Sequence, residues 1–291
     1  MEISGKTKVF CVIGDPIEHS LSPIMHNAAF RHLKIDAVYL AFKVGAKMLE
    51  DAVKGIRSFG IYGVNVTTPH KTAITNYIDE SDSVVKFVGA VNTVLNSEGN
   101  LVGFNTDGIG ALRALEENGV KTKGKKFLLL GAGGAGRAIA FQLAQEADEL
   151  VILNRDVAKA RLLADALRKR FNKEIFADSP SRDVLKNWIG NVDVLINATS
   201  VGMHPNEEQT PVEKGLLKPE LTVMDIVYNP IETRLLKDAK SIGAKVIYGT
   251  EMLVFQGAAS FEIWFKRPAP VKVMREAIFE KLQTGGLSLG R

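Results

Sequence analysis

Cysteine and long apolar runs are both scarce in this sequence. Cys11 is the only cysteine among 291 residues, so a disulfide within one chain is excluded. It lies in the strand-like segment 9–13, where we expect a buried, inert thiol rather than a catalytic one. No apolar segment approaches the roughly 18 residues of a membrane span, and residues 1–8 lack the apolar core of a signal peptide. The sequence therefore predicts a cytoplasmic protein without a membrane partner.

Metal-binding and nucleic-acid-binding patterns are also missing. The five histidines are not spaced as metal ligands and have no cysteine partners, so no metal site is expected. Net charge is +4 at pH 7, but the basic clusters at 121–126 and 161–170 are not interleaved with aromatic residues. We interpret these clusters as solvated faces and expect no nucleic-acid partner. A mild positive charge instead suits a small anionic ligand.

Periodicity divides the chain into two series of alternating strands and helices. The first series has expected strands at 9–13, 38–42 and 62–66 and helices at 23–33 and 46–59. This alternation predicts a parallel sheet with helices on its faces. After a helix at 109–118, the second series has strands at 127–130, 150–153, 192–196, 223–226 and 245–247, with helices at 137–147, 157–171 and 232–242. Two further helices, 252–265 and 271–282, are separated by a proline-containing break.

The order of these elements predicts an α/β protein with two domains. An N-terminal α/β domain should cover residues 1–107, and a doubly wound, Rossmann-type domain should cover residues 108–249. The remaining segment, 250–291, is too short for a third domain. We therefore expect its helices to return to the first domain.

A glycine-rich loop directly follows the expected strand 127–130. Its sequence, Gly131-Ala132-Gly133-Gly134-Ala135-Gly136, contains the Gly-x-Gly-x-x-Gly pattern and opens the next helix. Glycines at these positions allow a pyrophosphate to approach the helix N-terminus, where amide donors and the helix dipole favour negative charge. The loop therefore predicts a dinucleotide site, and the alternative is a glycine-rich turn that binds nothing.

The residues after the next strand bear on which dinucleotide binds. NAD sites commonly have an acidic residue there, about twenty residues beyond the loop, whereas NADP sites use arginine to bind the 2′-phosphate. Here the strand is followed by Asn154-Arg155-Asp156. Neutral Asn154 takes the acidic position and Arg155 can form a bidentate contact with a phosphate, so NADP is favoured. Asp156 either opposes the phosphate or caps the following helix.

Polar side chains stand at several expected element ends in the N-terminal part. Ser20 and Ser22 precede a helix, with Ser22 expected as its N-cap, and hydroxyls at a helix N-terminus can hold a carboxylate. Lys71 and Asp107 each follow a strand-like run, where open α/β sheets bind their ligands. Asn92 lies between them in the sequence. We expect one site for a small polyhydroxylated acid; the alternatives are a solvated Lys71 and an Asp107 that only caps a helix.

In their order and spacing, these segments resemble those of shikimate dehydrogenases. The match runs from about Val12 to Trp264, nearly the whole chain. The matching motifs are Ser20-Leu21-Ser22-Pro23, Asn65-Val66-Thr67-x-Pro69-x-Lys71, Gly89-Ala90-Val91-Asn92-Thr93, Gly103-x-Asn105-Thr106-Asp107-Gly108, Gly131-Ala132-Gly133-Gly134-Ala135, Asn154-Arg155, Asn197-Ala198-Thr199 and Gln256-Gly257-Ala258. Asp156 departs from the family, which often has threonine there.

The resemblance implies NADPH-dependent, reversible reduction of 3-dehydroshikimate to shikimate, in the chorismate pathway of aromatic amino acid biosynthesis. It implies that Lys71 and Asp107 are the catalytic pair. The substrate-binding residues that it implies are Ser20, Ser22, Thr67, Lys71, Asn92, Asp107, Tyr228 and Gln256. The NADP-binding residues that it implies are Gly131, Ala132, Gly133, Gly134, Ala135, Asn154, Arg155, Asp156, Lys159, Thr199, Ile226 and Gly249.

Two other functions stay open. A quinate/shikimate dehydrogenase that uses NAD would share the substrate residues and differ around residues 154–156. A non-catalytic dinucleotide-binding sensor is disfavoured by the Lys71/Asp107 pair, because a sensor has no use for a proton donor beside the nicotinamide. The sequence also leaves open whether Lys71 transfers the proton or only stabilises charge, and whether the chain forms a homodimer.

Overall fold

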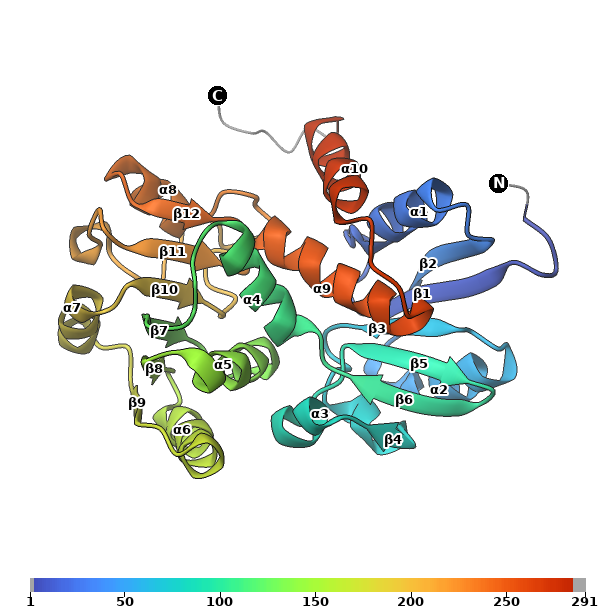
Figure 1. Cartoon of the computed structure of the whole chain (residues 1–291), viewed down its shortest axis with the longest axis horizontal. Coiled ribbons are helices and arrows are strands. Elements are labelled where there is room, and N and C mark those ends of the chain that lie inside the picture. Colours follow the sequence, from blue (N-terminus) through green and yellow to red (C-terminus); the bar gives the residue numbers. More distant parts are fainter. Residues whose placement is uncertain (1–2, 285–291) are drawn as a thin grey trace. The chain divides into compact units, whose positions relative to one another are not determined.

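Two units, each built around a six-stranded sheet, make up the residues 3–284 that the computed structural model describes (Figure 1). Of these residues, the first unit contains 3–107 and 256–284, and the second contains 108–255. Both units are of the α/β class, which confirms the predicted fold class. Residues 285–291 of the expected C-terminal segment lie outside the described residues.

The first unit has the strand order β2-β1-β3-β5-β6-β4. Its strands are β1 (Lys8–Gly14), β2 (Ala37–Lys43), β3 (Gly63–Val66), β4 (Glu80–Ser81), β5 (Thr93–Ser97) and β6 (Asn100–Phe104). Its helices are α1 (Ser22–His32), α2 (Leu49–Ser58), α3 (Ser83–Val88), the larger part of α9 (Gly249–Phe265) and α10 (Val271–Thr284). Helix α10 packs on α1, as expected for C-terminal helices that return to this unit.

The three strands that the sequence predicted for the first unit pair in parallel, as expected, but the sheet also contains three strands that were not predicted, β4, β5 and β6. β1 pairs in parallel with β2 and β3, but β5 is antiparallel to both β3 and β6. β5 and β6 form a hairpin whose two turn residues, Glu98 and Gly99, have φ of 53° and 90°. A two-residue turn with positive φ at both positions suits the twist of paired strands. Because β5 runs backwards, it begins at the edge of the sheet where β3 and β6 end.

Large side chains cover both faces of this sheet. On one face, Cys11 belongs to an apolar cluster with residues of α2, and burial raises the pKa of its thiol to about 12. On the other face, the ring of Phe10 lies 5.2 Å from that of Phe30 in α1 and 5.1 Å from that of Trp264 in α9. Trp264 Nε1 donates a hydrogen bond to the Val94 carbonyl at 3.0 Å. Helix α9 is therefore fixed against β5.

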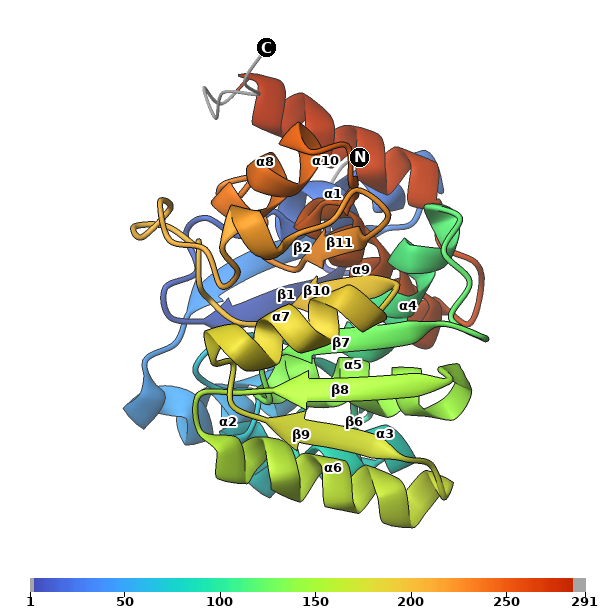
Figure 2. The same cartoon turned by 90° about the vertical axis from the view of Figure 1, so that its left-hand side faces the viewer.

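The second unit is a fully parallel sheet with the order β12-β11-β10-β7-β8-β9. Its strands are β7 (Lys126–Leu130), β8 (Glu149–Leu153), β9 (Ile175–Asp178), β10 (Val194–Asn197), β11 (Thr222–Asp225) and β12 (Lys245–Ile247). Its helices are α4 (Asp107–Glu117), α5 (Gly134–Glu146), α6 (Val157–Phe171), α7 (Arg182–Asn191) and α8 (Arg234–Ser241). Figure 2 shows α7 in front of the sheet and α5 behind it, as in a doubly wound unit. The sequence patterns missed β9 and α7.

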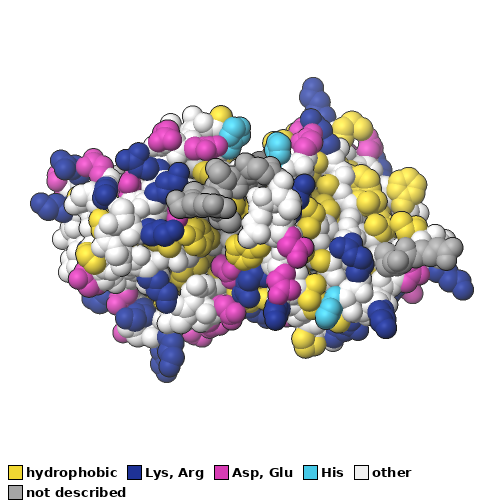
Figure 3. All heavy atoms as spheres, turned by 90° about the horizontal axis from the view of Figure 1, so that it is seen from above, with side chains coloured by type: hydrophobic (Ala, Val, Ile, Leu, Met, Phe, Trp, Pro, Cys, Tyr) yellow, Lys and Arg dark blue, Asp and Glu magenta, His cyan; other side chains and the backbone are white. Residues whose placement is uncertain are grey.

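The charge distribution on the surface, the length of the helices and the placement of possible metal ligands are relevant to nucleic-acid, membrane and metal binding. On the face shown in Figure 3, basic and acidic side chains are interspersed. No helix within residues 3–284 is long and apolar enough to cross a membrane. The same residues contain no group of three or more His, Cys, Asp or Glu side chains that could hold a metal ion.

His26 is a buried ionisable side chain in the core of the first unit. It is 0% exposed, its ring stacks on that of Tyr39 at 4.5 Å, and its two ring nitrogens have no hydrogen-bond partner among the described residues. Desolvation lowers the pKa of this imidazole from 6.5 to about 3. Below pH 6.5 the unfolded chain therefore binds a proton that the folded chain does not. The unfolding free energy therefore decreases as the pH falls below 6.5, because protonation favours the unfolded chain.

We expect His26→Phe to remove this part of the pH dependence. On moving from pH 8 to about pH 5, the wild type should lose about 2 kcal/mol of unfolding free energy through His26, and the variant should not. Urea unfolding at both pH values measures the difference. His32→Phe, at an exposed position of the same helix, is the control and should follow the wild-type curve. An equal loss in His26→Phe and the wild type would show that the folded chain protonates His26.

Candidate active site

Polar side chains of the first unit gather at one edge of its sheet. β3 and β6 end at this edge, and β5 begins there. Lys71 follows β3 in a turn, Asn92 directly precedes β5, and Asp107 follows β6 and begins α4. The topology thus brings together three side chains that are far apart in the sequence, as the hypothesis of one shared site requires.

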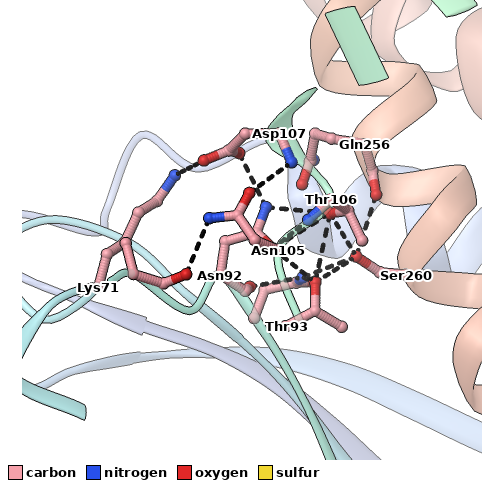
Figure 4. Close-up of polar contacts among 10 residues, drawn as sticks. Lys71, Asn92, Thr93, Asn105, Thr106, Asp107, Gln256 and Ser260 are labelled. Carbon is pink, nitrogen blue, oxygen red and sulfur yellow. Dashed lines mark hydrogen bonds and ion pairs between the residues drawn. The ribbon is translucent and has the colours of Figure 1, made fainter. Parts of the chain in front are cut away.

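Lys71 and Asp107 form a close ion pair. Lys71 Nζ lies 2.6 Å from Asp107 Oδ2 (Figure 4). The Lys71 side chain is 25% exposed, whereas that of Asp107 is only 6% exposed. The second carboxylate oxygen, Oδ1, accepts a hydrogen bond from Asn92 Nδ2 at 2.8 Å. The carboxylate is therefore held from both sides, and the ammonium group stays within reach of a ligand.

The orientation of the Asn92 amide follows from its backbone partner. The Thr106 N–H donates to Asn92 Oδ1 at 2.8 Å, and a backbone N–H can only donate. Oδ1 therefore faces Thr106, which leaves Nδ2 to face the Asp107 carboxylate. The Asp107 N–H is in turn bound by Asn105 Oδ1 at 3.0 Å, and Asn105 Nδ2 donates to the Ala90 carbonyl. These bonds fix the turn that leads from β6 into α4.

The predicted N-cap role of Ser22 is wrong. Helix α1 begins at Ser22, and Leu21 takes the N-cap position without a side-chain hydrogen bond. The partly exposed Ser20 supplies the hydroxyl instead, because its Oγ accepts from the Ser22 N–H at 3.3 Å. Ser22 itself is buried and hydrogen-bonds Tyr39. Desolvation raises the pKa of Tyr39 well above 10, and the bond from Ser22 acts in the opposite direction.

The other expected substrate residues lie in both units. Thr67 directly follows β3 and is partly exposed. Gln256 belongs to α9, and Figure 4 shows it beside Asp107. Tyr228 lies in the second unit, in the loop after β11, where desolvation raises the pKa of its hydroxyl. The first unit by itself therefore brings together Lys71, Asn92, Asp107 and Gln256.

The glycine-rich loop in the second unit fits a pyrophosphate. Gly131 has a φ of 109°, and a Cβ there would lie 2.8 Å from the Ala198 carbonyl oxygen. A Cβ on Gly136 would lie 2.2 Å from the Gly131 carbonyl oxygen, so the fold itself requires both glycines. Gly133 is the N-cap of α5, and a Cβ there would meet no atom within 4 Å. Open space therefore lies at the helix N-terminus, where a pyrophosphate would be bound.

The segment after β8 presents charged side chains next to this loop. Asn154 Oδ1 accepts from the Ala132 N–H at 3.2 Å, which ties the segment to the glycine-rich loop. Arg155, Asp156 and Lys159 are exposed. Asp156 takes the N-cap position of α6, as expected, but its side chain makes no capping hydrogen bond. Its Oδ2 lies 3.4 Å from Lys159 Nζ instead.

A buried hydrogen-bond network that was not expected from the sequence fixes the loops that carry Thr199 and Ile226. Asn197 Oδ1 accepts from Thr199 Oγ1 at 2.7 Å, and Asn197 Nδ2 donates to Asp225 Oδ1 at 3.0 Å. Thr233 Oγ1 donates to Asp225 Oδ2 at 2.8 Å. Desolvation raises the pKa of Asp225, which is 0% exposed, to about 6. The network fixes the loops after β10 and β11, and polar residues that end two buried apolar strands were its signal in the sequence.

Ile226 and Gly249 complete the expected cofactor set. Ile226 directly follows β11 and is partly exposed, and Gly249 begins α9. A Cβ on Gly249 would lie 2.4 Å from the Val227 carbonyl oxygen. The loop after β11 and the start of α9 are therefore in close contact.

Family models for shikimate dehydrogenases match most of the chain. They describe the shikimate dehydrogenase substrate binding domain at residues 12–94, shikimate / quinate 5-dehydrogenase at 113–235, and the shikimate 5'-dehydrogenase C-terminal domain at 249–279. A relative from Methanopyrus kandleri, named shikimate dehydrogenase (NADP(+)), is 48% identical over 286 residues, which cover 97% of this chain and 99% of the relative.

Solved structures of similar proteins agree with this assignment. A shikimate dehydrogenase in complex with NADP+ is 44% identical, with a TM-score of 0.90 over 96% of this chain and 97% of the other. A shikimate 5-dehydrogenase from Listeria monocytogenes, in complex with shikimate and NAD, is 41% identical, with a TM-score of 0.89 over 96% of this chain and 99% of the other. Through both units, and with the motifs of its substrate and glycine-rich loops in place, this chain belongs to the shikimate dehydrogenase family.

Proposed function

We propose that the chain catalyses the reversible, NADPH-dependent reduction of 3-dehydroshikimate to shikimate in aromatic amino acid biosynthesis. The observation that carries the proposal is the Lys71–Asp107 ion pair, 2.6 Å long and set among Asn92, Gln256 and the segment after β3. The family's NADP-dependent members support the choice of cofactor. The first unit binds the substrate, the second binds NADP, and the cytoplasm is the proposed location. A homodimer is the proposed assembly.

The residues of the first unit account for the proton in this reaction. NADPH supplies the hydride when it is bound. The Lys71 ammonium donates a proton to the developing alkoxide, or stabilises its charge, because it is the partly exposed cation of the site. Asp107 orients Lys71 and accepts a hydrogen bond from a substrate hydroxyl. Ser20 and Ser22, at the start of α1, bind the substrate carboxylate.

The second unit would hold NADP through its glycine-rich loop and the segment after β8. The open space before α5 accommodates the pyrophosphate, and Asn154 keeps the next segment against the loop. Arg155 and Lys159 are exposed cations that suit the 2′-phosphate, whereas Asp156 opposes it. Thr199 after β10, Ile226 after β11 and Gly249 at the start of α9 would complete the site for the cofactor.

Four initial rates test the proposed function. Shikimate and quinate are each measured with NADP and with NAD, and the shikimate/NADP pair should give the highest kcat/KM. A higher value for quinate with NAD would favour the quinate/shikimate dehydrogenase alternative. No turnover of either acid, while NADP still binds in calorimetry, would favour a dinucleotide-binding sensor.

Lys71→Ala should lower kcat at least about a hundredfold, the usual effect of losing a general acid or base. Calorimetry should show a much smaller loss of shikimate binding, since the other polar groups remain. The control is Lys54→Ala, which removes a lysine paired with Glu50 at 2.7 Å on the surface of the same unit. A near-wild-type kcat in Lys71→Ala, with a strongly raised KM for shikimate, would show that Lys71 only binds the substrate.

Arg155→Ala should lower kcat/KM for NADP roughly ten- to a hundredfold, the scale of a charge-assisted contact worth about 1.5–3 kcal/mol. The value for NAD should change little, because NAD has no 2′-phosphate. Asp156→Thr should improve kcat/KM for NADP, since it removes a carboxylate and frees Lys159. Arg161→Ala, at another exposed position of α6, serves as the control. Equal losses for NADP and NAD in Arg155→Ala would contradict the assignment.

A further inference from the structure

Three buried hydroxyl groups lie next to Asn92, on the side away from Lys71 (Figure 4). They belong to Thr93 at the start of β5, Thr106 just before α4, and Ser260 in α9, and we call them the hydroxyl cluster. Thr93 and Ser260 are 0% exposed and Thr106 is 2% exposed. Ser260 Oγ lies 2.8 Å from Thr93 Oγ1 and 3.3 Å from Thr106 Oγ1. Buried hydroxyls reduce stability unless they are hydrogen-bonded, so the bonding of this cluster is under strong constraint.

The hydroxyl cluster binds both ends of the Asn92 amide. Thr93 Oγ1 donates to Asn92 Oδ1 at 3.0 Å, and Asn92 Nδ2 donates to Thr106 Oγ1 at 3.0 Å. The same Nδ2 donates to Asp107 Oδ1 at 2.8 Å. The cluster therefore favours the amide orientation in which Asn92 holds the carboxylate that pairs with Lys71.

Ser260 connects the cluster to α9. Its Oγ donates to the Gln256 carbonyl, one helical turn earlier, at 3.0 Å. Asn65 Nδ2 donates to Ser260 Oγ at 3.0 Å and to Thr93 Oγ1 at 3.2 Å. Asn65 Oδ1 accepts from the Tyr39 hydroxyl at 2.7 Å. The turn of α9 that carries Gln256 is therefore linked to Asn92, through Ser260 and Thr93, by a continuous chain of hydrogen bonds.

The hydrogen bonds donated by the Ser260 and Thr93 hydroxyls depend on each other. Each has one proton to donate. When Ser260 donates to the Gln256 carbonyl, its 2.8 Å contact requires the proton of Thr93, which then leaves Asn92 Oδ1. When Thr93 donates to Asn92, Ser260 must donate to Thr93. Removing the Ser260 hydroxyl ends this exchange and leaves the Thr93 proton to Asn92 Oδ1 alone, so the bonding of Asn92 changes although Asn92 itself is unaltered.

We propose that Ser260 is a positioning residue for the dehydrogenase reaction, acting through Thr93 and Asn92 on the Lys71–Asp107 pair. This inference rests on the proposed function. Ser260 is fully buried and its bonds go to the protein, so it does not contact the substrate. Its contribution is to keep the Asp107 carboxylate, and with it the Lys71 ammonium, in one orientation. Small displacements of catalytic groups reduce the rate of the chemical step more than they reduce binding.

Ser260→Ala tests the proposal in the full-length enzyme with shikimate and NADP. We expect kcat to fall about tenfold while KM for shikimate changes by less than about threefold. Thr93→Val removes the other hydroxyl at nearly constant shape and should lower kcat similarly. Thr93→Ser keeps that hydroxyl and should restore most of the wild-type kcat. The double variant Ser260→Ala/Thr93→Val should lose less than the product of the two single losses, since both act on Asn92.

Ser58→Ala is the matched control. Ser58 Oγ donates to the Lys54 carbonyl one turn earlier, which is the same helical bond as that of Ser260, but it lies outside the hydroxyl cluster. Its kcat should equal that of the wild type. Thermal melting of every variant shows that rates are compared on folded protein. If Thr93→Val does not fold, the kcat values of Ser260→Ala and Thr93→Ser alone test the role of Ser260.

Three results would overturn the inference. They are a wild-type kcat in folded Ser260→Ala, an equal loss in Thr93→Ser and Thr93→Val, and an equal loss in Ser58→Ala and Ser260→Ala. In each case the wild type still turns over shikimate, so the proposed function stands and only the role of Ser260 fails. A wild type that does not turn over shikimate would remove both.

Discussion

The Asp107 carboxylate is the group on which the arrangement of the candidate site depends. A charge that is almost fully buried needs partners on each oxygen, because the loss of hydration is not otherwise offset. Lys71 supplies the charge partner and Asn92 supplies a neutral donor, while Asn105 binds the adjacent N–H.

Each of these partners sits at a strand end or in the turn into α4, so the β3, β5 and β6 termini must meet at one edge. The antiparallel hairpin of β5 and β6 is the part of the fold that achieves this. The requirements of one buried carboxylate thus extend through the whole edge of the first sheet.

The glycine-rich loop of the second unit depends on backbone packing rather than on paired side chains. Gly131 and Gly136 are needed by the fold itself, since any side chain there would collide with neighbouring carbonyl groups. Gly133 is not, and its lack of a side chain leaves room at the helix N-terminus. The buried Asp225 with Asn197 then holds the loops that face the same strand ends. The candidate site of the first unit is therefore built on paired charges, whereas the glycine-rich loop of the second unit leaves open space at a helix N-terminus.

The sequence predicted that Lys71, Asn92 and Asp107 lie together, and it predicted much of the second unit, but less of how the first unit is built. Lys71, Asn92 and Asp107 could be placed together because strand ends in α/β sheets converge, and the glycine-rich loop has a local pattern that does not depend on distant contacts. The hairpin was missed because it interrupts an otherwise regular βα series, although Gly99 between the two short apolar segments 94–95 and 101–102 was its signal. Ser22 failed as an N-cap because the preceding Ser20 hydroxyl already binds its N–H, a choice that sequence cannot distinguish. Ser260 and Thr93 could not be linked at all, since 167 residues separate them and only tertiary packing brings them to 2.8 Å.

Electrostatics at the segment after β8 bears on how strictly NADP is preferred. Asp156 is the departure from the family pattern, and a carboxylate there would by itself repel a 2′-phosphate. The side chain is not isolated, however, because Lys159 lies 3.4 Å away and both are more than half exposed. A surface pair of this kind is worth about 0–1 kcal/mol, so an arriving phosphate can draw Lys159 away at little cost. With Arg155, the segment then offers two cations against one carboxylate. The balance favours the phosphate, but by less than it would with a neutral residue at position 156.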